Sequence, residues 1–300
     1  MKALQYREYG APDVLEVADA DEPHARPGTV RIAVKAASVN PIDWKARQGL
    51  LSKEPLDAPV IAGYDGAGVV DEVGDGVDGV AVGDEVFGLG SATQAEHAVL
   101  EAWAVKPAAM SWTEAAALPV AFETAARAFD LVGVGDGTTV VVDGAAGGVG
   151  SAAVQLGVAR GATVIGTASE GNHDYLRSIG ASPTTYGDGL AERVAELAPQ
   201  GVDAGFDTAG KGSVATLIEI VGDPQKVVTI ADFSAGALGA HVTGGRSPRA
   251  ADFLAEAASL YEQGKLEVTV AKTFPLADAA EAHRESQGGH VRGKLVLVVE

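Results

Sequence analysis

The segment from Thr138 to Ser169 constrains the fold of this chain more than any other part of its sequence. It opens with the β-branched run Thr139–Val142, which is typical of a strand buried on both faces. A glycine-rich turn at Gly144–Gly150 follows, then an apolar-periodic run at Ala152–Ala159 and a second β-branched run at Thr163–Ile165. A strand, a tight glycine turn, a helix and a second strand within roughly 30 residues form the βαβ unit that binds a dinucleotide pyrophosphate. The segment therefore predicts a nucleotide-binding site, with a merely structural turn as the alternative.

The small residues of this turn each have an expected role. Ala145 stands where the first glycine of a G-x-G-x-x-G motif would lie, Gly147 lets backbone approach the phosphates, and Gly150 lets the helix pack against the strand. The pyrophosphate would rest on the free N–H groups and the positive dipole end of the helix. The turn residues predicted to contact the cofactor are Ala145, Gly147, Gly148, Val149 and Gly150.

Composition limits the classes of partner. A length of 300 residues leaves room for two domains, and 47% hydrophobic with 21% charged residues is typical of a soluble globular protein. The net charge of −19 argues against nucleic acid or an anionic membrane as a partner. Without cysteine there is no disulfide, no thiolate nucleophile and no cysteine-ligated zinc. The N-terminus has no apolar signal region and no run reaches the ~20 residues of a membrane span, so we expect a cytoplasmic protein.

The predicted secondary structure changes from strands to helices near residue 111. Before that point, short apolar runs broken by Gly, Pro and Asp predict a barrel-like β module. Ser111-x-x-Glu114 is a capping box that opens alanine-rich helical sequence through Leu131, divided by Pro119. From Thr138 to about residue 242, strands and helices alternate, which predicts a doubly wound parallel sheet.

The C-terminal part reads as a helix followed by a β-rich tail. The helix is expected at Ala251–Gly264, and the tail as a strand at Leu266–Val270, a helix at Asp278–Gln287 and a strand at Lys294–Val299. Because this β content matches the first module, we expect the tail to return to it. The sequence thus predicts an α/β chain with a first domain at 1–115, completed by 265–300, and a nucleotide-binding domain at 116–264.

Short motifs occur along nearly the whole chain. Together they are specific evidence for a protein family, although each motif alone would be weak evidence. They are Ala37-Ser38-Val39-Asn40-Pro41-Ile42-Asp43-Trp44-Lys45, Gly63-Tyr64-Asp65-Gly66-Ala67-Gly68-Val69-Val70 with Val73-Gly74, Val82-Gly83-Asp84-Glu85-Val86, Gly144–Gly150 with Gln155-Leu156, Phe206-Asp207-Thr208 and Gly293-Lys294-Leu295-Val296-Leu297. With these motifs the chain resembles the quinone oxidoreductase branch of the medium-chain dehydrogenase/reductase superfamily, the ζ-crystallin-like proteins. The resemblance implies a GroES-like domain plus a Rossmann domain, with the active site in the cleft between them, in a homodimer or tetramer.

The chain departs from the zinc-dependent alcohol dehydrogenases of the same superfamily. Their catalytic zinc needs a cysteine and the histidine of a G-H-E motif, whereas the matching residues here are Gly63-Tyr64-Asp65. A phenol is a poor zinc ligand, and no pair among the six histidines has the spacing of a ligand motif. We therefore expect a site without metal, in which alcohol oxidation by Lewis-acid catalysis is disfavoured.

Three residues of the first domain are candidates for the chemistry. The resemblance places Asn40 beside the nicotinamide, where its amide could orient substrate or a bound water, although an Asn-Pro turn is the plain alternative. Lys45 could donate to a substrate carbonyl, or be an ordinary surface lysine. Tyr64 could donate a hydrogen bond to a developing oxyanion or enolate, or be a core aromatic.

Further residues are candidates for contact with the cofactor. By resemblance, Thr124 contacts the nicotinamide carboxamide, with an ordinary helix threonine as the alternative. Residues at the carboxyl ends of later strands would face the ligand because Rossmann ligands lie at that edge; these are Thr208, Ala209, Ile230 and Ala231. In the basic tail of His290, Arg292 and Lys294, the last two could close over the cofactor, or the tail could be a solvated face.

The residue after the second strand of the βαβ unit predicts the type of cofactor. NAD-binding units carry an acidic residue there for the ribose 2′-OH, and here the position is Ser169, whose hydroxyl can donate to a 2′-phosphate. Asn172 and His173 follow as further donors, and the resemblance adds Tyr186. Because Glu170 is adjacent and the usual arginine is absent from the loop, we expect NADP(H) to be preferred over NAD(H) with moderate discrimination.

The sequence as a whole favours an NADPH-dependent, zinc-independent reductase of a small electrophile, either a quinone or an α,β-unsaturated carbonyl. Two alternatives stay open: a non-catalytic NADPH-binding sensor or structural protein of the same fold, and a pathway-specific enoyl reductase. Gly239–Gly244 looks like a late edge strand, which predicts a homodimer through that edge.

Overall fold

The computed structural model describes residues 1–299 and groups them into two compact units. Unit 1 consists of Met1–Val120, Arg249–Glu262 and the residues from Val268 onward, and unit 2 consists of Ala121–Pro248 and Gln263–Glu267. The division falls within one helix, between Val120 and Ala121. Among the described residues, no helix is long and apolar enough to cross a membrane.

Unit 1 is a β structure whose centre is one long strand. Its strands are β1 (Lys2–Tyr6), β2 (Glu16–Asp19), β3 (Val30–Val39), β4 (Val60–Ile61), β5 (Asp65–Val73), β6 (Glu85–Ser91), β7 (His97–Val105), β14 (Val270–Pro275) and β15 (Lys294–Val298). One sheet has the order β2-β1-β4 and the other β14-β15-β3-β5-β6-β7, with β7 pairing back onto β3. Because β3 pairs with both β5 and β7, the strands β3, β5, β6 and β7 close into a barrel. This confirms the predicted GroES-like β domain.

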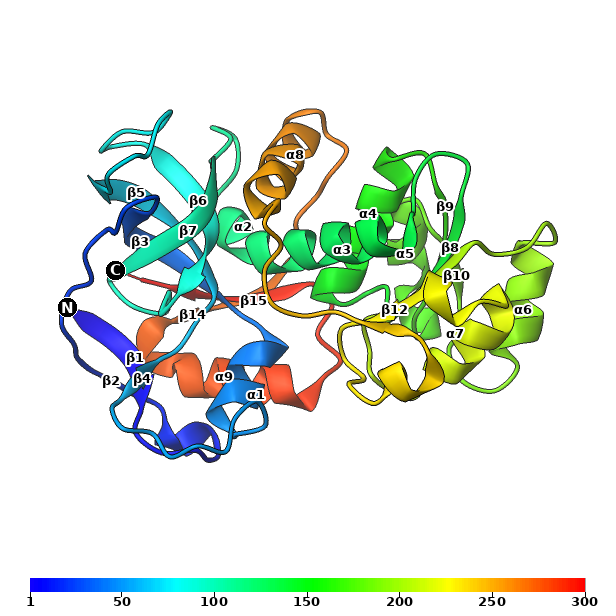
Figure 1. The fold of residues 1–300 in the computed structure, drawn as a ribbon, viewed down its shortest axis with the longest axis horizontal. Coiled ribbons are helices and arrows are strands. Elements are labelled where there is room, and N and C mark those ends of the chain that lie inside the picture. Colours follow the sequence, from blue (N-terminus) through cyan, green and yellow to red (C-terminus); the bar gives the residue numbers. More distant parts are fainter. Residues whose placement is uncertain (300) are drawn as a thin grey trace. The chain divides into compact units, whose positions relative to one another are not determined.

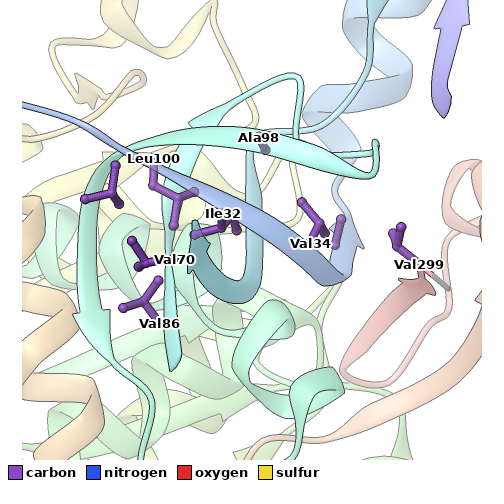
Figure 2. Packing of buried hydrophobic residues seen from close by; sticks show 9 residues of the cluster. Ile32, Val34, Val70, Val86, Ala98, Leu100 and Val299 are labelled. Atoms are coloured by element: carbon purple, nitrogen blue, oxygen red, sulfur yellow. The ribbon is translucent and has the colours of Figure 1, made fainter. Parts of the chain in front are cut away.

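The barrel core follows from the alternation of side chains along β3. Val30, Ile32 and Val34 are buried, while Lys35 points to solvent, as the period of two along a strand requires. Figure 2 shows Ile32 and Val34 beside buried residues of the partner strands. The cluster also contains Val70, Val86, Ala98, Leu100 and Val299. Removing this apolar surface from water is the main source of stability for the barrel.

The helices of unit 1 come from both ends of the chain. They are α1 (Pro41–Arg47), α2 (Trp112–Ala117), α8 (Ala250–Glu262) and α9 (Ala279–Gly288), with short 3-10 turns at Pro12–Val14 and Leu276–Asp278. The predicted capping box is present: Glu114 N donates to Ser111 Oγ, and Ser111 N donates to the Glu114 carboxylate. The nucleotide-binding domain expected at 116–264 includes α8, but the helix groups with unit 1, where it packs on β7 (Figure 1) and Tyr261 Oη donates to Ala109 O at 3.4 Å.

The C-terminal tail belongs to unit 1, because β15 pairs antiparallel to β3. The strand predicted at Leu266–Val270 is wrong: β14 begins only at Val270. The side chain of Gln155 explains the difference, since its amide donates to Glu267 O at 3.0 Å and its oxygen accepts from Glu267 N at 2.7 Å. These backbone groups are paired with a side chain, so the segment needs no neighbouring strand.

Unit 2 is a parallel sheet with helices. Its strands are β8 (Thr139–Asp143), β9 (Thr163–Thr167), β10 (Ser182–Thr184), β11 (Ala204–Asp207), β12 (Val227–Thr229) and β13 (His241–Val242), in the order β10-β9-β8-β11-β12-β13. The helices are α3 (Pro119–Val132), α4 (Gly148–Ala159), α5 (His173–Ser178), α6 (Leu190–Leu197) and α7 (Val214–Val221), with short turns at Glu170–Asn172, Pro224–Lys226 and Ala235–Leu238. Counted from β8, the strand order is 3-2-1-4-5-6, which is the Rossmann order. The predicted doubly wound sheet is therefore confirmed.

Candidate active site

The glycine turn of unit 2 connects β8 to the N-terminus of α4. A Cβ added at Gly150 would lie 2.2 Å from Gly144 O, so only glycine allows this close approach of helix and turn. Gly147 is the N-cap of α4, and a Cβ there would meet nothing closer than 3.4 Å. The first N–H groups of α4, at Gly148 and Val149, have no acceptor within the helix and can bind an anion. The turn therefore fits a pyrophosphate.

Ala145 takes part in this turn in a different way from the one expected. It is fully buried, and its N–H donates to Thr167 O at 3.0 Å. A Cβ added at Gly166 would lie 2.8 Å from Cβ of Ala145, so the residue is packed against β9. Its side chain holds the turn in place and presents no surface to a ligand.

Two buried aspartates organise the carboxyl edge of the parallel sheet. Asp143, at the end of β8, accepts from the hydroxyls of Thr167 and Ser213, the second at 2.7 Å. Asp207, at the end of β11, accepts from Ala209 N at 3.0 Å, from Gly210 N at 2.9 Å and from Thr229 Oγ1 at 2.6 Å. These bonds order the loops after β8 and β11. The sequence analysis did not predict that these two aspartates act together, because β8 and β11 are neighbours in the sheet but are separated by β9 and β10 in the sequence.

The same edge positions the remaining predicted cofactor residues of unit 2. Thr208 Oγ1 donates to Asp143 O at 2.7 Å, and Ala231 N donates to Thr229 Oγ1 at 3.1 Å. The loops after the adjacent strands β11 and β12 thus lie at one edge of the sheet, beside the glycine turn, and they carry Thr208, Ala209, Ile230 and Ala231. Thr124 lies elsewhere, in α3, where it is 8% exposed and Arg127 Nη2 contacts its hydroxyl at 3.5 Å.

The loop after β9 brings together three of the predicted ribose-phosphate residues. Ser169 is exposed at the N-terminus of the Glu170–Asn172 turn, and Asn172 Nδ2 donates to Ser169 Oγ at 3.2 Å. His173 Nε2 lies 3.3 Å from Ala168 O. Tyr186 follows the neighbouring strand β10 and is 60% exposed, so its ring is available to a ligand.

Unit 1 contains a second buried polar network, which includes Asn40. Asn40 Nδ2 donates to Ser38 Oγ at 3.0 Å and to Asp65 Oδ1 at 2.8 Å, and its Oδ1 accepts from Lys294. Ser38 Oγ also donates to Asp65 Oδ1, at 2.6 Å, and Asp65 Oδ2 accepts from Val120 N at 2.9 Å. Both amide protons of Asn40 are therefore used within the protein. The amide was expected to act directly on the substrate, but it has no free N–H for this. Asn40 instead fixes the start of α1.

Asp43 joins this network from α1. Its Oδ2 accepts from Asn40 N at 2.6 Å and from Gln94 Nε2 at 3.3 Å, while its buried Oδ1 has no hydrogen-bond partner among residues 1–299. Burial raises the pKa of the Asp43 carboxyl to about 7, and the negative Asp65 adds to this shift, while Lys294 opposes it. The carboxyl therefore titrates near neutral pH.

The structure corrects the expectation for Lys294. The side chain is 8% exposed at the start of β15 and donates to Asn40, so it does not belong to a solvated tail. Burial lowers the pKa of Lys294, and the two nearby aspartates oppose this. Its physical role is to bring positive charge to two buried carboxyls. Arg292 is exposed and lines a hollow of about 370 Å³ with Thr269, Glu285 and His290.

Tyr64 and Lys45 lie in the segments that flank this network. Gly63 has φ of +103°, and a Cβ there would lie 2.4 Å from Thr93 Oγ1, so glycine is required before Tyr64. Tyr64 is half-buried; burial raises the pKa of its phenol, and the negative charge of Asp43 adds to the shift. The phenol is therefore protonated at neutral pH. On α1, the Lys45 ammonium lies 5.7 Å from the centre of the Trp44 ring.

Family models match both parts of the chain. An alcohol dehydrogenase GroES-like domain matches residues 26–118, and a zinc-binding dehydrogenase domain matches residues 179–297. Although the second description names zinc, residues 1–299 contain no group of three or more His, Asp or Glu side chains that could hold a metal ion.

Individual relatives agree with these matches. The chain is 35% identical to 2-methylene-furan-3-one reductase of Solanum lycopersicum, with 77% of this chain and 62% of that protein covered. It is 31% identical to the chloroplastic NADPH-dependent alkenal/one oxidoreductase of Arabidopsis thaliana, with 99% and 79% covered. The structure of the quinone oxidoreductase from Coxiella burnetii superposes with a TM-score of 0.85 at 31% identity, covering 100% of this chain and 99% of that one.

The fold and the nucleotide-binding edge define a dehydrogenase/reductase with a GroES-like and a Rossmann unit. The chain belongs to the medium-chain dehydrogenase/reductase superfamily, in its quinone oxidoreductase and alkenal reductase branch.

Proposed function

We propose that this protein is an NADPH-dependent, zinc-independent reductase of small electrophiles, namely quinones or α,β-unsaturated carbonyls. The observation that carries the proposal is Tyr64, a half-buried protonated phenol at the position where the zinc enzymes of the superfamily have a metal-ligating histidine. The relatives support the substrate class, since one is described as an alkenal/one oxidoreductase and another as a quinone oxidoreductase.

The glycine turn and the loops at the carboxyl edge would hold the cofactor. The N–H groups at the start of α4 would bind its pyrophosphate, and the loops ordered by Asp143 and Asp207 would bind its ribose and nicotinamide parts. When bound, NADPH supplies the hydride, and the protein contributes position and electrostatics.

Tyr64 would stabilise the negative charge that develops on a substrate oxygen. Because its pKa is raised, the phenol keeps its proton and donates a hydrogen bond. An enone needs this donor most, since hydride addition at the β-carbon leaves charge on the enolate oxygen. A quinone needs it less, because its ring becomes aromatic on reduction and delocalises the charge. Asn40 and Lys294 would act by holding α1 and its residue Lys45 in place.

The test compares NADPH oxidation with a benzoquinone and with a small enone in wild type and in Tyr64→Phe. We expect turnover of at least one class, and a loss of kcat/KM of about 10²-fold for the enone in the variant with a smaller loss for the quinone. NADPH affinity should not change. Tight NADPH binding without turnover of any electrophile would instead support the non-catalytic sensor, and slow turnover of every generic substrate would support the pathway-specific reductase.

We also propose that the enzyme prefers NADPH over NADH and does not use zinc. The exposed Ser169 hydroxyl supports the first point, because it can donate to a 2′-phosphate where an acidic residue would repel it. Ser169→Asp should shift the ratio of kcat/KM toward NADH. Turnover that is unchanged by a chelator, with no zinc in the purified protein by elemental analysis, would agree with the second point, and loss of activity on chelation would refute it.

A homodimer through the edge strand β13 completes the proposal. His241–Val242 is the last strand of the parallel sheet, and the nearby Leu238 and Val242 are exposed apolar side chains. Two copies could pair their β13 strands around a two-fold axis. Light scattering at micromolar concentration should give the mass of a dimer, and a monomeric mass would contradict it.

A further inference from the structure

Two neighbouring loops of unit 2 leave the same edge of the parallel sheet. Strand β10 pairs parallel with β9, with Thr184 opposite Thr167, and Ala168 N donates to Thr184 O at 3.0 Å. Ser169 lies in the loop after β9. The segment Thr185–Gly189, which carries the exposed Tyr186, is the loop after β10. The two loops therefore begin side by side.

Arg193 of α6 makes hydrogen bonds along the loop after β10. Its Nε donates to Thr184 Oγ1 at 3.2 Å, its Nη1 to Asp188 O at 2.8 Å and its Nη2 to Thr185 O at 2.8 Å. A longer contact of 3.5 Å joins Nη2 to Tyr186 O. One half-buried guanidinium thus spans the whole turn between β10 and α6.

The charge of Arg193 is not neutralised within the part of the chain that the structure describes. All four of its contacts go to neutral oxygens, and it forms no ion pair there, although Glu192 is its neighbour in sequence. A guanidinium has five N–H donors, so at least one remains for a ligand. Arg177 of α5 is different, because its Nη1 lies 2.7 Å from the Asp174 carboxylate.

We propose that Arg193 is a specificity-determining residue that selects nucleotides with a 2′-phosphate. The inference rests on the nucleotide site of the proposed function and deepens it. Arg193 orders the turn that carries Tyr186 and supplies positive charge to this turn, which starts on the strand next to the one that leads to Ser169, on a protein with a net charge of −19. A doubly charged phosphate gains from this cation where a free ribose hydroxyl does not. The arginine missing from the loop after β9 is thus provided by α6.

The experiment measures binding of 2′,5′-ADP and of ADP by isothermal titration calorimetry. The proteins are wild type, Arg193→Gln, Arg193→Lys and the control Arg177→Gln, whose charge is already paired. We expect Arg193→Gln to weaken 2′,5′-ADP binding about 10- to 100-fold, the range for one charged hydrogen bond, and to leave ADP binding within about twofold. Arg193→Lys should fall between, and added salt should weaken 2′,5′-ADP binding more in wild type than in Arg193→Gln.

The other possible binding results distinguish a structural role of Arg193 from a role in selectivity. Equal loss of both ligands in Arg193→Gln and Arg193→Lys would show a purely structural role and overturn the proposal, as would unchanged binding of 2′,5′-ADP. Equal loss of both ligands in Arg193→Gln alone would also count against the proposal, because the selectivity for the 2′-phosphate would then be unchanged in that variant. If wild type binds neither ligand, the proposed nucleotide site itself fails. If wild type binds ADP more tightly than 2′,5′-ADP, the NADPH preference and this inference both fail, whereas quinone turnover tests the enzyme activity separately.

Discussion

The two units each bury a pair of aspartates, but they satisfy them differently. In unit 2 every carboxylate oxygen of Asp143 and Asp207 accepts a hydrogen bond from a hydroxyl or a backbone N–H. In unit 1 both oxygens of Asp65 accept hydrogen bonds, yet Asp43 Oδ1 has no partner within the residues that the structure describes, and the buried ammonium of Lys294 supplies positive charge to both carboxyls. Buried carboxylates whose oxygens all accept hydrogen bonds can therefore order loops. Where one oxygen is left without a hydrogen bond, the stability of the network depends on nearby charge and on pH.

The largest effect is expected for Lys294→Met. The change leaves Asn40 Oδ1 without a donor and removes the cation facing Asp43 and Asp65, which should destabilise unit 1 by about 3–5 kcal/mol. Urea unfolding followed by tryptophan fluorescence measures this, because all three tryptophans lie in unit 1. The control is Lys272→Met, an exposed lysine paired with Glu281, for which little change is expected. Equal effects of the two changes would contradict the comparison.

The pH dependence of unit 1 should show two opposing contributions. The folded pKa of Asp43 is raised from 3.8 to about 7, so its contribution to stability is present at low pH and is lost as pH rises through this range. Neither ring nitrogen of His283, on α9, has a hydrogen-bond partner in the described part of the chain, and burial, with the charge of Arg47, lowers its pKa from 6.5 to about 3. Its contribution is present above pH 6.5 and is lost as pH falls.

Between pH 4 and 6.5 these two contributions should nearly cancel. Asp43→Asn should leave a stability of unit 1 that rises with pH, and His283→Phe one that falls with pH, each with a slope of up to about 1.4 kcal/mol per pH unit. The measurement is urea unfolding at a series of pH values, compared with wild type so that other titrating groups cancel. Parallel profiles for the two variants would refute this assignment of the slopes.

Asp207→Ala tests the fully bonded network of unit 2. It leaves Thr229 Oγ1 and the N–H groups of Ala209 and Gly210 without their acceptor, which should cost about 3 kcal/mol. Amide hydrogen exchange at the loop after β11 measures this, since tryptophan fluorescence reports on unit 1. Asp207→Asn should retain most protection, because its amide oxygen can still accept from the backbone. If Asn is as damaging as Ala, charge matters more than hydrogen bonding in this network.

The smallest expected effects come from a matched pair of serines. Ser38 Oγ donates to Asp65 at 2.6 Å and also accepts from Asn40, while Ser213 Oγ donates to Asp143 at 2.7 Å. Ser38→Ala should therefore cost about 2 kcal/mol and Ser213→Ala about 1 kcal/mol. Thermal unfolding of both variants, followed by circular dichroism, provides the measurement. A larger loss in Ser213→Ala would reverse the ranking of the two networks.

The sheet of unit 2 was predictable because its signals are local. The Val140–Val142 run, the glycines of the turn and the helix after them lie within one short segment, and each favours the same structure. The strand ends that carry Ser169 and Thr208 follow from that pattern. The strand expected at Leu266–Val270, outside this sheet, is absent at residues 266–269 because the side chain of Gln155, distant in sequence, bonds the backbone N–H and C=O of Glu267.

The network of unit 1 was not predictable in the same way. The contact between Asn40 and Lys294 joins residues 254 positions apart, and no local pattern marks a lysine that becomes buried. The lysine therefore reads as part of a solvated basic tail. Arg193 escaped sequence reasoning for a related reason, since its turn contacts arise from the packing of α6 beside β10.

The pairing of β15 with β3 also affects the order in which the chain can assemble during synthesis. The partner of β3 at this edge spans Lys294–Val298, whereas every strand of the parallel sheet has been made by Val242. On the ribosome, the nucleotide-binding sheet therefore has all its strands while the first-made unit still lacks β14 and β15 and leaves one backbone edge of β3 unpaired. Between the synthesis of Val242 and that of Val298, the N-terminal unit is therefore the one that still exposes an unpaired strand to mispairing with other nascent chains.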